Sequence, residues 1–251
     1  MRHIPGARMD RFYEKKWIVE AVNVVPPILV AGIGAYTSWS DPHKAAAAPY
    51  LAGGAAWLLV GSAIKVMNAT AQDRERKRVA DYDGLSAALR VLYATVRQVA
   101  KVDSEDGDVV RLTIHRVVPP KKGKAPGETL EQLLPYFCRS GGGAGRTFSI
   151  HTGIIGKAAR ERAILTATRG ASHYDAFIRE LVREYAFTEA DALRLRADRH
   201  AWMAVPILAT DGNTMAVVYL DSSDRDFFSA EVQAVVAAGC AGVTSYIHEA
   251  Y

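Results

Sequence analysis

The sequence predicts an α+β fold, in which an N-terminal transmembrane helical hairpin precedes an antiparallel sheet flanked by helices. Three observations lead to this prediction. Two runs of 20 residues without a charge, 21–40 and 45–64, stand close together near the N-terminus. An alternation of apolar and polar residues with a period of two begins at Val109 and is typical of strands. Segments with helical spacing precede and follow the strand-like segments.

The two uncharged runs have the length of membrane-spanning helices. Each would cross about 30 Å of hydrocarbon at a rise of about 1.5 Å per residue. Residues 40–44 (SDPHK) form a short polar turn between them. Aromatic residues that favour the membrane–water interface lie near the ends of the runs: Trp17, Tyr36, Trp39 and Tyr50. The sequence therefore predicts a two-helix transmembrane hairpin over residues 17–68.

The positive charge of the chain is concentrated around this hairpin. The formal net charge is +4 and the pI is about 9.0. Residues 1–80 hold 11 Lys/Arg against 6 Asp/Glu, whereas residues 81–251 hold 20 against 21. Because basic segments beside a membrane stay in the cytoplasm, we expect a protein of the inner (plasma) membrane with a basic cytoplasmic N-terminus over 1–16 and with both termini and the C-terminal domain in the cytoplasm. The same distribution argues against a nucleic-acid partner.

Two other interpretations of the N-terminal third stay open. A cleaved signal peptide also begins with basic residues, but no clean small-x-small cleavage site follows the first run. A buried soluble hairpin would need an unusually large core for two uncharged helices. In the first helix, Glu20, Asn23 and the prolines at 26 and 27 are unusual for a membrane span. One interpretation is a polar stripe that lines a pore. The other is that Glu20 is an interfacial side chain close to Lys16.

A polar, strongly helix-forming segment over 69–84 is expected to be a helical linker. An apolar stripe with alternating spacings of three and four follows, and it predicts a helix over 85–102 that opens a soluble domain at 85–251. The stripe either packs against the domain core or also joins two copies of the chain. Asp83 and Gly84 interrupt it and weaken a continuous helix by roughly 1 kcal/mol. The members of the stripe are Tyr82, Leu85, Leu89, Leu92, Val96 and Val99.

The rest of the domain alternates between strand and helix patterns. Strands are expected at 109–118, 129–138, 146–150, 164–168, 201–209 and 215–220, and helices at 153–162, 174–185, 188–195 and 229–249. Thr188 is a candidate N-cap, and a flexible glycine-rich connection occupies 141–145. This order predicts a central antiparallel sheet with the terminal helices on one face and a helical excursion on the other.

Five short motifs in this order resemble those of GAF domains. They are TGIIG at 152–156, WMAVPI at 202–207, Asp211 with Gly212, MAVVYLDS at 215–222, and Phe228 with Ser229 at the start of the last helix. The resemblance covers about residues 85–250, and Ala216 departs from it where the family often has glycine. It implies a GAF-like sensor domain that is cytoplasmic, often dimeric, and binds cyclic nucleotides, haem, bilins or small metabolites between the sheet and the excursion, although some members bind nothing known.

The residues do not identify the ligand among these classes, and the cofactor stays unknown. Phe187 and Asp191 match the cyclic-nucleotide pattern of the family only weakly. The two cysteines, at 138 and 240, do not form the cysteine cluster of the free-methionine-sulfoxide reductase branch, and they rule out an all-cysteine zinc site. Haem would require an axial histidine, for which His151 and His200 are candidates.

We expect no catalysis and no metal centre, because no HExxH, CxxC, GxSxG or phosphate-loop motif occurs. The candidate walls of a ligand pocket combine aromatic, apolar and basic residues. Arg169 and the free N–H groups at the helix start over 153–156 would hold an anion. The alternative is that the aromatics are core and Arg169 is solvated. The candidate ligand-binding residues are Phe148, His151, Ile155, Arg169, Tyr174, Phe177, Trp202 and Tyr219.

The leading hypothesis is therefore a non-catalytic membrane-anchored sensor. It would bind a small molecule, anionic or nucleotide-like, and signal through helix packing as a homodimer or higher homo-oligomer. One alternative is a ligand-gated two-span effector that forms a pore or disrupts the membrane, as in nucleotide-signalled bacterial defence. The other is an inert protein-interaction module.

Overall fold

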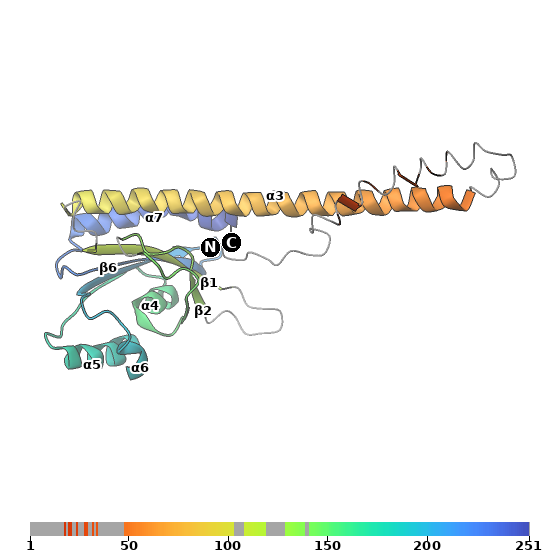
Figure 1. The fold of residues 1–251 in the computed structure, drawn as a ribbon. Coiled ribbons are helices and arrows are strands. Elements are labelled where there is room, and N and C mark those ends of the chain that lie inside the picture. Colours follow the sequence, from red (N-terminus) through yellow and green to blue (C-terminus); the bar gives the residue numbers. More distant parts are fainter. Residues whose placement is uncertain are drawn as a thin grey trace. The chain divides into compact units, whose positions relative to one another are not determined.

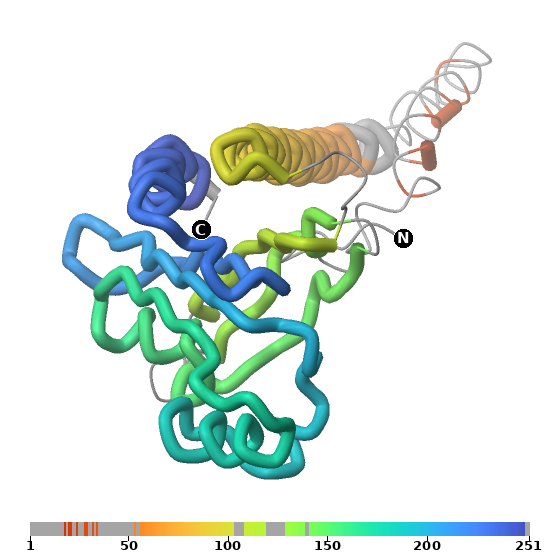
Figure 2. Tube along the Cα trace, turned by 90° about the vertical axis from the view of Figure 1, so that its left-hand side faces the viewer, coloured from red at the N-terminus to blue at the C-terminus, as the bar shows by residue number. Residues whose placement is uncertain are grey.

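The computed structural model describes residues 48–102, 108–118, 129–138 and 141–250, together with a few separate positions between 18 and 34. The basic segment 1–16, the turn at 40–44 and most of the first uncharged run lie outside the described residues. The chain divides into two units, with described residues 48–79 in one and 80–250 in the other. The larger unit contains a six-stranded sheet and helices on both of its faces (Figures 1 and 2).

All neighbouring strands of the sheet are antiparallel, in the order β3-β2-β1-β6-β5-β4. The strands are β1 (Val110–Val117), β2 (Thr129–Gln132), β3 (Thr147–Ser149), β4 (Leu165–Thr168), β5 (Ala201–Leu208) and β6 (Thr214–Ser222). Each predicted strand is present, but β2 is shorter than the predicted 129–138. Pro135 has no N–H to donate to the ladder, so the chain leaves the strand, and a single bridge between Phe137 and Leu112 remains.

The helices lie on the two faces as the resemblance to GAF domains implies. Residues 80–99 of α3 (Ala48–Val99) and α7 (Ala230–Ala250) run along one face, and α4 (Gly153–Glu161), α5 (Tyr174–Tyr185) and α6 (Glu189–Ala192) cover the other (Figure 1). The Thr188 side chain accepts a hydrogen bond from the Asp191 N–H at 3.1 Å, which confirms the predicted N-cap. The helix that it caps ends at Ala192, three residues before the predicted end.

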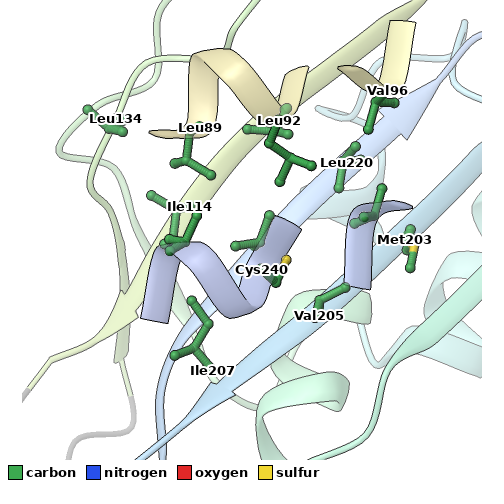
Figure 3. Packing of buried hydrophobic residues seen from close by; sticks show 14 of the residues in the cluster. Leu89, Leu92, Val96, Ile114, Leu134, Met203, Val205, Ile207, Leu220 and Cys240 are labelled. Atoms are coloured by element: carbon green, nitrogen blue, oxygen red, sulfur yellow. The ribbon is translucent and has the colours of Figure 1, made fainter. Parts of the chain in front are cut away.

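The larger core lies between the sheet and the α3–α7 pair. The predicted α3 stripe from Tyr82 to Val96 is buried there, which confirms its role in core packing. Alternate residues of β1, β5 and β6 meet it, because successive side chains of a strand point to opposite faces. Figure 3 shows Leu89, Leu92 and Val96 of α3 with Cys240 of α7 above strand residues that include Ile114, Met203 and Leu220.

Two glycines allow α3 and α7 to approach closely. A Cβ on Gly239 would lie 2.4 Å from Cδ1 of Leu92, and one on Gly84 would lie 2.5 Å from Cε1 of Tyr246. α3 is continuous through Asp83 and Gly84, so the interruption expected between linker and domain helix is wrong. The helix-weakening glycine is accommodated because the ring of Tyr246 packs where its side chain would be.

Substituting Gly239 is expected to destabilise the domain. Gly239→Ala gains about 1 kcal/mol of helix propensity but drives a methyl group into Leu92, which is 5% exposed, and such overpacking costs about 1–3 kcal/mol. Gly242→Ala in the same helix is the matched control, because no atom lies within 4 Å of its Cβ position. Urea titrations should show that the free energy of unfolding falls for Gly239→Ala and rises by up to about 1 kcal/mol for Gly242→Ala. Equal changes in the two variants would contradict the close approach of α3 and α7.

In the smaller unit, α3 exposes a run of apolar side chains. Four consecutive residues, Trp57, Leu58, Leu59 and Val60, are exposed, and Val66 and Met67 follow. Among the helices of the described residues, one segment has the length and apolar composition of a membrane span, Ala230–His248 of α7. That segment contributes Val236 and Ile247 to the domain core. The predicted hairpin over 17–68 stays a prediction.

Candidate functional site

A cavity of about 810 Å³ lies between the sheet and the helices α4 to α6. Its wall combines aromatic rings with charged groups. The aromatic residues are Tyr136, Phe148, Phe177, Tyr185, Phe187, Trp202 and Tyr219. The charged residues are Arg111, Arg146, Arg194, Arg196, Arg199, Asp191 and Asp221. A concave site with apolar walls and a few convergent polar groups is typical of small-molecule binding.

The structure brings five of the eight candidate residues together at this cavity. They are Phe148, Ile155, Phe177, Trp202 and Tyr219. The rings of Phe177 and Trp202 stack with centroids 6.0 Å apart and an interplanar angle of 4°. These two come from α5 and β5, so the stack joins the excursion to the sheet and presents an aromatic surface in the cavity wall.

The other three candidates do not line the cavity. His151 is exposed in the turn before α4, and Tyr174, the first residue of α5, is also exposed. Arg169 is buried and braces the backbone beside the cavity. Its guanidinium donates to the carbonyls of Ala171 and Ala197 at 2.9 Å each and lies 4.2 Å from the centroid of the cavity residue Phe177. The alternative that Arg169 is solvated is therefore wrong, and its role in ligand binding stays a prediction.

The main polar group of the cavity is an ion pair that the sequence analysis missed. Arg111 of β1 donates to both carboxylate oxygens of Asp221 of β6, at 2.8 and 2.6 Å. The two residues face each other in the strand register, and the Arg111 guanidinium lies 4.5 Å from the ring centroid of Tyr136. The sequence does contain a signal for this pair, namely one charged residue at an inward-facing position of β1 and one of β6. Buried charges are found in pairs, so each of these residues indicates a partner of opposite charge.

Arg199 is a second buried cation beside this pair. Its side chain is 3% exposed and lies 3.8 Å from Asp221. It donates to the Asp108 carbonyl at 2.6 Å and to the Asp198 carboxylate at 3.0 Å. Arg196 also binds Asp198, at 2.6 Å. The inner cations of the cavity are thus neutralised by protein carboxylates.

Burial and these charges fix the protonation states of the inner wall. Burial opposes the charge of Arg111, but the hydrogen bonds that it donates to Asp221 raise its pKa, so it stays a cation. Burial, reinforced by Asp221, raises the pKa of Tyr136 and of Tyr219, so both keep their phenolic protons. Burial favours a neutral Asp198, but Arg196 and Arg199 lower its pKa to about 2. The wall therefore presents fixed cations and phenol groups near neutral pH.

Two features at the cavity leave positive potential for a ligand. Within the described residues, Arg146 makes no ion pair, whereas Arg194 lies 3.5 Å from Asp191. The first residues of α4 line the cavity without a side-chain N-cap hydrogen bond, since Thr152 makes none. Free N–H groups at a helix start attract anions. Among the described residues there is no cluster of three or more His, Cys, Asp or Glu side chains that could hold a metal ion.

No protein-family model matches the chain, and no curated protein matches it. Solved structures do resemble it. Type II free methionine-R-sulfoxide reductase from Thermoplasma acidophilum has 12% identity and a TM-score of 0.42, covering 66% of this chain and 96% of that one. The GAF domain of an Acinetobacter phosphoenolpyruvate-protein phosphotransferase has 14% identity and a TM-score of 0.40, covering 68% and 94%. The GAF domain of a two-component sensor histidine kinase from Bacillus halodurans has 12% identity and a TM-score of 0.42, covering 64% and 94%.

Proposed function

We propose that this chain is a non-catalytic sensor, anchored in the plasma membrane, whose GAF-like domain binds an anionic small molecule with a planar ring, such as a nucleotide-like compound. The cavity between the sheet and α4–α6 carries the proposal, because its wall combines seven aromatic residues with five arginines. Aromatic faces bind planar rings by stacking, and guanidinium groups bind carboxylates and phosphates in pairs of hydrogen bonds.

Different residues of the cavity would bind the planar ring and the acidic group of the ligand. The stacked rings of Phe177 and Trp202 form part of the aromatic wall, and Phe148 is a more exposed ring in it. Arg111 and Arg199 are held by Asp221, whereas the Arg146 side chain faces no carboxylate among the described residues. Together with the N–H groups at the start of α4, Arg146 is the group best suited to bind the acidic part of the ligand.

Membrane anchoring is supported by the exposed part of α3. Exposed apolar side chains of a helix are stable where their surroundings are apolar, as in a bilayer. Residues 57–60 present four such side chains, and Lys65 and the basic residues at 74–78 follow them on the side assigned to the cytoplasm. We further propose that the chain forms a homodimer or higher homo-oligomer, through which a change in helix packing would be transmitted.

The thiols support a non-catalytic role. Cys240 is buried in α7, and burial raises its pKa to about 12, so the nucleophilic thiolate is suppressed. The Cys138 sulfur accepts a hydrogen bond from the Gly141 N–H at 3.3 Å. Cys240 belongs to the core between the sheet and the α3–α7 pair, whereas Cys138 is outside that core and follows the bridge residue Phe137. Output would then come from a partner protein or from the membrane segment.

A second candidate function is the ligand-gated membrane effector. It is favoured by the fact that one helix, α3, carries both the exposed apolar residues at 57–60 and the residues that pack on the sheet. Liposomes containing the full chain distinguish the two functions. Ion leakage on addition of a bound ligand would favour the effector, and intact liposomes would favour the sensor.

The proposal is tested by screening the full-length protein against nucleotides, other aromatic phosphates and carboxylates, haem and cell extract. A true ligand at a hundred times its Kd should stabilise the fold by about 2.7 kcal/mol in thermal unfolding. Native mass spectrometry would identify it. If no compound co-purifies or raises the melting temperature, the chain is an inert interaction module and the proposal fails.

Arg146→Gln should lower the affinity for an anionic ligand by about 10- to 100-fold, since a hydrogen bond to a charged group contributes about 1.5–3 kcal/mol. Arg179→Gln, on the outer side of α5, is the control and should leave the affinity unchanged. Calorimetric titration of both variants measures the difference. Equal affinities would remove Arg146 from the site.

A further inference from the structure

His115 is a buried histidine with no polar partner. It lies in β1 on the same side of the strand as Arg111 and Thr113, which is the side of the cavity. Its exposure is 0%, and neither ring nitrogen has a hydrogen-bond partner within the described part of the chain. Its ring makes edge contacts with Phe148, at 5.3 Å between centroids, and with Tyr219, at 6.1 Å. Both of these aromatic residues line the cavity.

Gln132 of β2 is a second partly unpartnered group beside it. Gln132 faces His115 in the strand register, so the two side chains project from the same face. Its Nε2 donates to the carbonyls of Leu134 and Gly142, at 2.8 and 3.3 Å, while its buried Oε1 has no partner among the described residues. Leu130, two residues away on the same face, lines the cavity.

Three buried polar atoms without hydrogen bonds are unusual in a core. Each unmade hydrogen bond of this kind costs about 1–3 kcal/mol, and an apolar side chain of similar size would avoid the cost. Burial lowers the pKa of His115 to about 3, so the ring is neutral and offers one donor and one acceptor. With the Gln132 oxygen, the group offers one donor and two acceptors.

Phe148 links His115 to the cavity, because its ring contacts the His115 ring and also lines the cavity wall. It is the middle residue of β3, a three-residue strand at the edge of the sheet, and its side chain is 39% exposed. A ring at a short edge strand has little packing to hold it in place. A rotation of Phe148 would therefore bring the polar atoms into contact with a ligand.

We propose that His115 and Gln132 form a polar subsite of the cavity, closed by Phe148, that receives the edge of a planar amide or lactam. Such an edge carries an N–H donor beside a carbonyl acceptor and so complements the Gln132 oxygen and the N–H of the His115 ring. The proposal deepens the proposed function, on which it rests for the use of the cavity. The subsite is uncharged, so it recognises a different part of the ligand from Arg146.

The test uses 2-pyridone, a neutral lactam, with N-methyl-2-pyridone as the control that lacks the donor. NMR of the full-length protein with ¹⁵N-labelled histidine should show that 2-pyridone shifts the ring-nitrogen resonances of His115. N-methyl-2-pyridone should bind at least tenfold more weakly. His115→Leu should weaken 2-pyridone at least tenfold and raise the melting temperature, whereas His151→Leu, at an exposed site, should change neither.

Phe148→Ala leaves His115 in place and tests the closing ring separately. It should tighten 2-pyridone binding at least threefold. Arg146→Gln should weaken anionic ligands and leave 2-pyridone unchanged, so the failure of the anion site and the failure of the polar subsite give different results. Unshifted His115 resonances in both the wild type and Phe148→Ala, or equal binding of the two pyridones, would overturn the proposal.

Discussion

Asp221→Asn is expected to destabilise the domain by about 3–5 kcal/mol, because it leaves two buried guanidinium groups without their shared counter-charge. The side chain of Asp221 is 2% exposed, that of Arg111 14% and that of Arg199 3%. An asparagine of the same shape has one acceptor oxygen in place of two, and its amide group would face a cation. Urea unfolding of the full-length protein measures the loss.

The control for this experiment is an exposed pair with a similar nitrogen–oxygen distance. Glu184 accepts from Arg183 at 2.8 Å, but both side chains are more than half exposed. Glu184→Gln should therefore cost about 1 kcal/mol or less. The double variant Arg111→Met, Asp221→Asn should lose less free energy of unfolding than the two single variants together. The reason is that each substitution removes the charge that the other leaves buried without a partner. Additive losses would show that the pair is not coupled.

Local sequence patterns were sufficient to predict most helices and strands of the sheet domain. α5 has the predicted bounds, Tyr174–Tyr185, because its apolar residues recur at helical spacing and bury Phe177, Ile178 and Leu181. The strands β1, β5 and β6 are buried at most of their positions, since each has a helix layer on both faces. Gly84 shows where local propensity fails. Its effect on α3 depends on Tyr246, more than 160 residues away along the chain.

The cavity could be predicted only in its aromatic part. Phe177 and Trp202 belong to recognisable elements on the excursion side of the sheet, so their meeting follows from the fold. The Arg111–Asp221 pair depends on the register of β1 against β6, which no local pattern specifies. Arg169 was assigned to the ligand because a cation beside aromatics suggests anion binding, yet backbone carbonyls at 171 and 197 satisfy it.

Acidification from pH 7 to pH 5 is expected to destabilise the domain by about 2 kcal/mol through His115 alone. Burial lowers its folded-state pKa to about 3, while in the unfolded chain the ordinary histidine value is about 6.5. The unfolded state thus binds a proton that the folded state does not, and stability falls as the pH drops from 6.5 towards 3. Above pH 7 the contribution is fully present. Asp198, whose pKa is lowered to about 2, begins to lose its contribution only at lower pH.

The His115→Leu variant isolates this effect, because leucine is close to histidine in volume and does not titrate. Free energies of unfolding from urea titrations at pH 7, 6 and 5 should show the wild type losing about 2 kcal/mol more than the variant over the interval. The exposed histidines at 151 and 173 are present in both proteins and cancel in the difference. Parallel pH profiles for the two proteins would mean that His115 gains a proton in the folded state, as it would if a carboxylate or water reached the ring. The same measurement therefore reports whether the polar atoms behind Phe148 are closed off from solvent before any ligand is added.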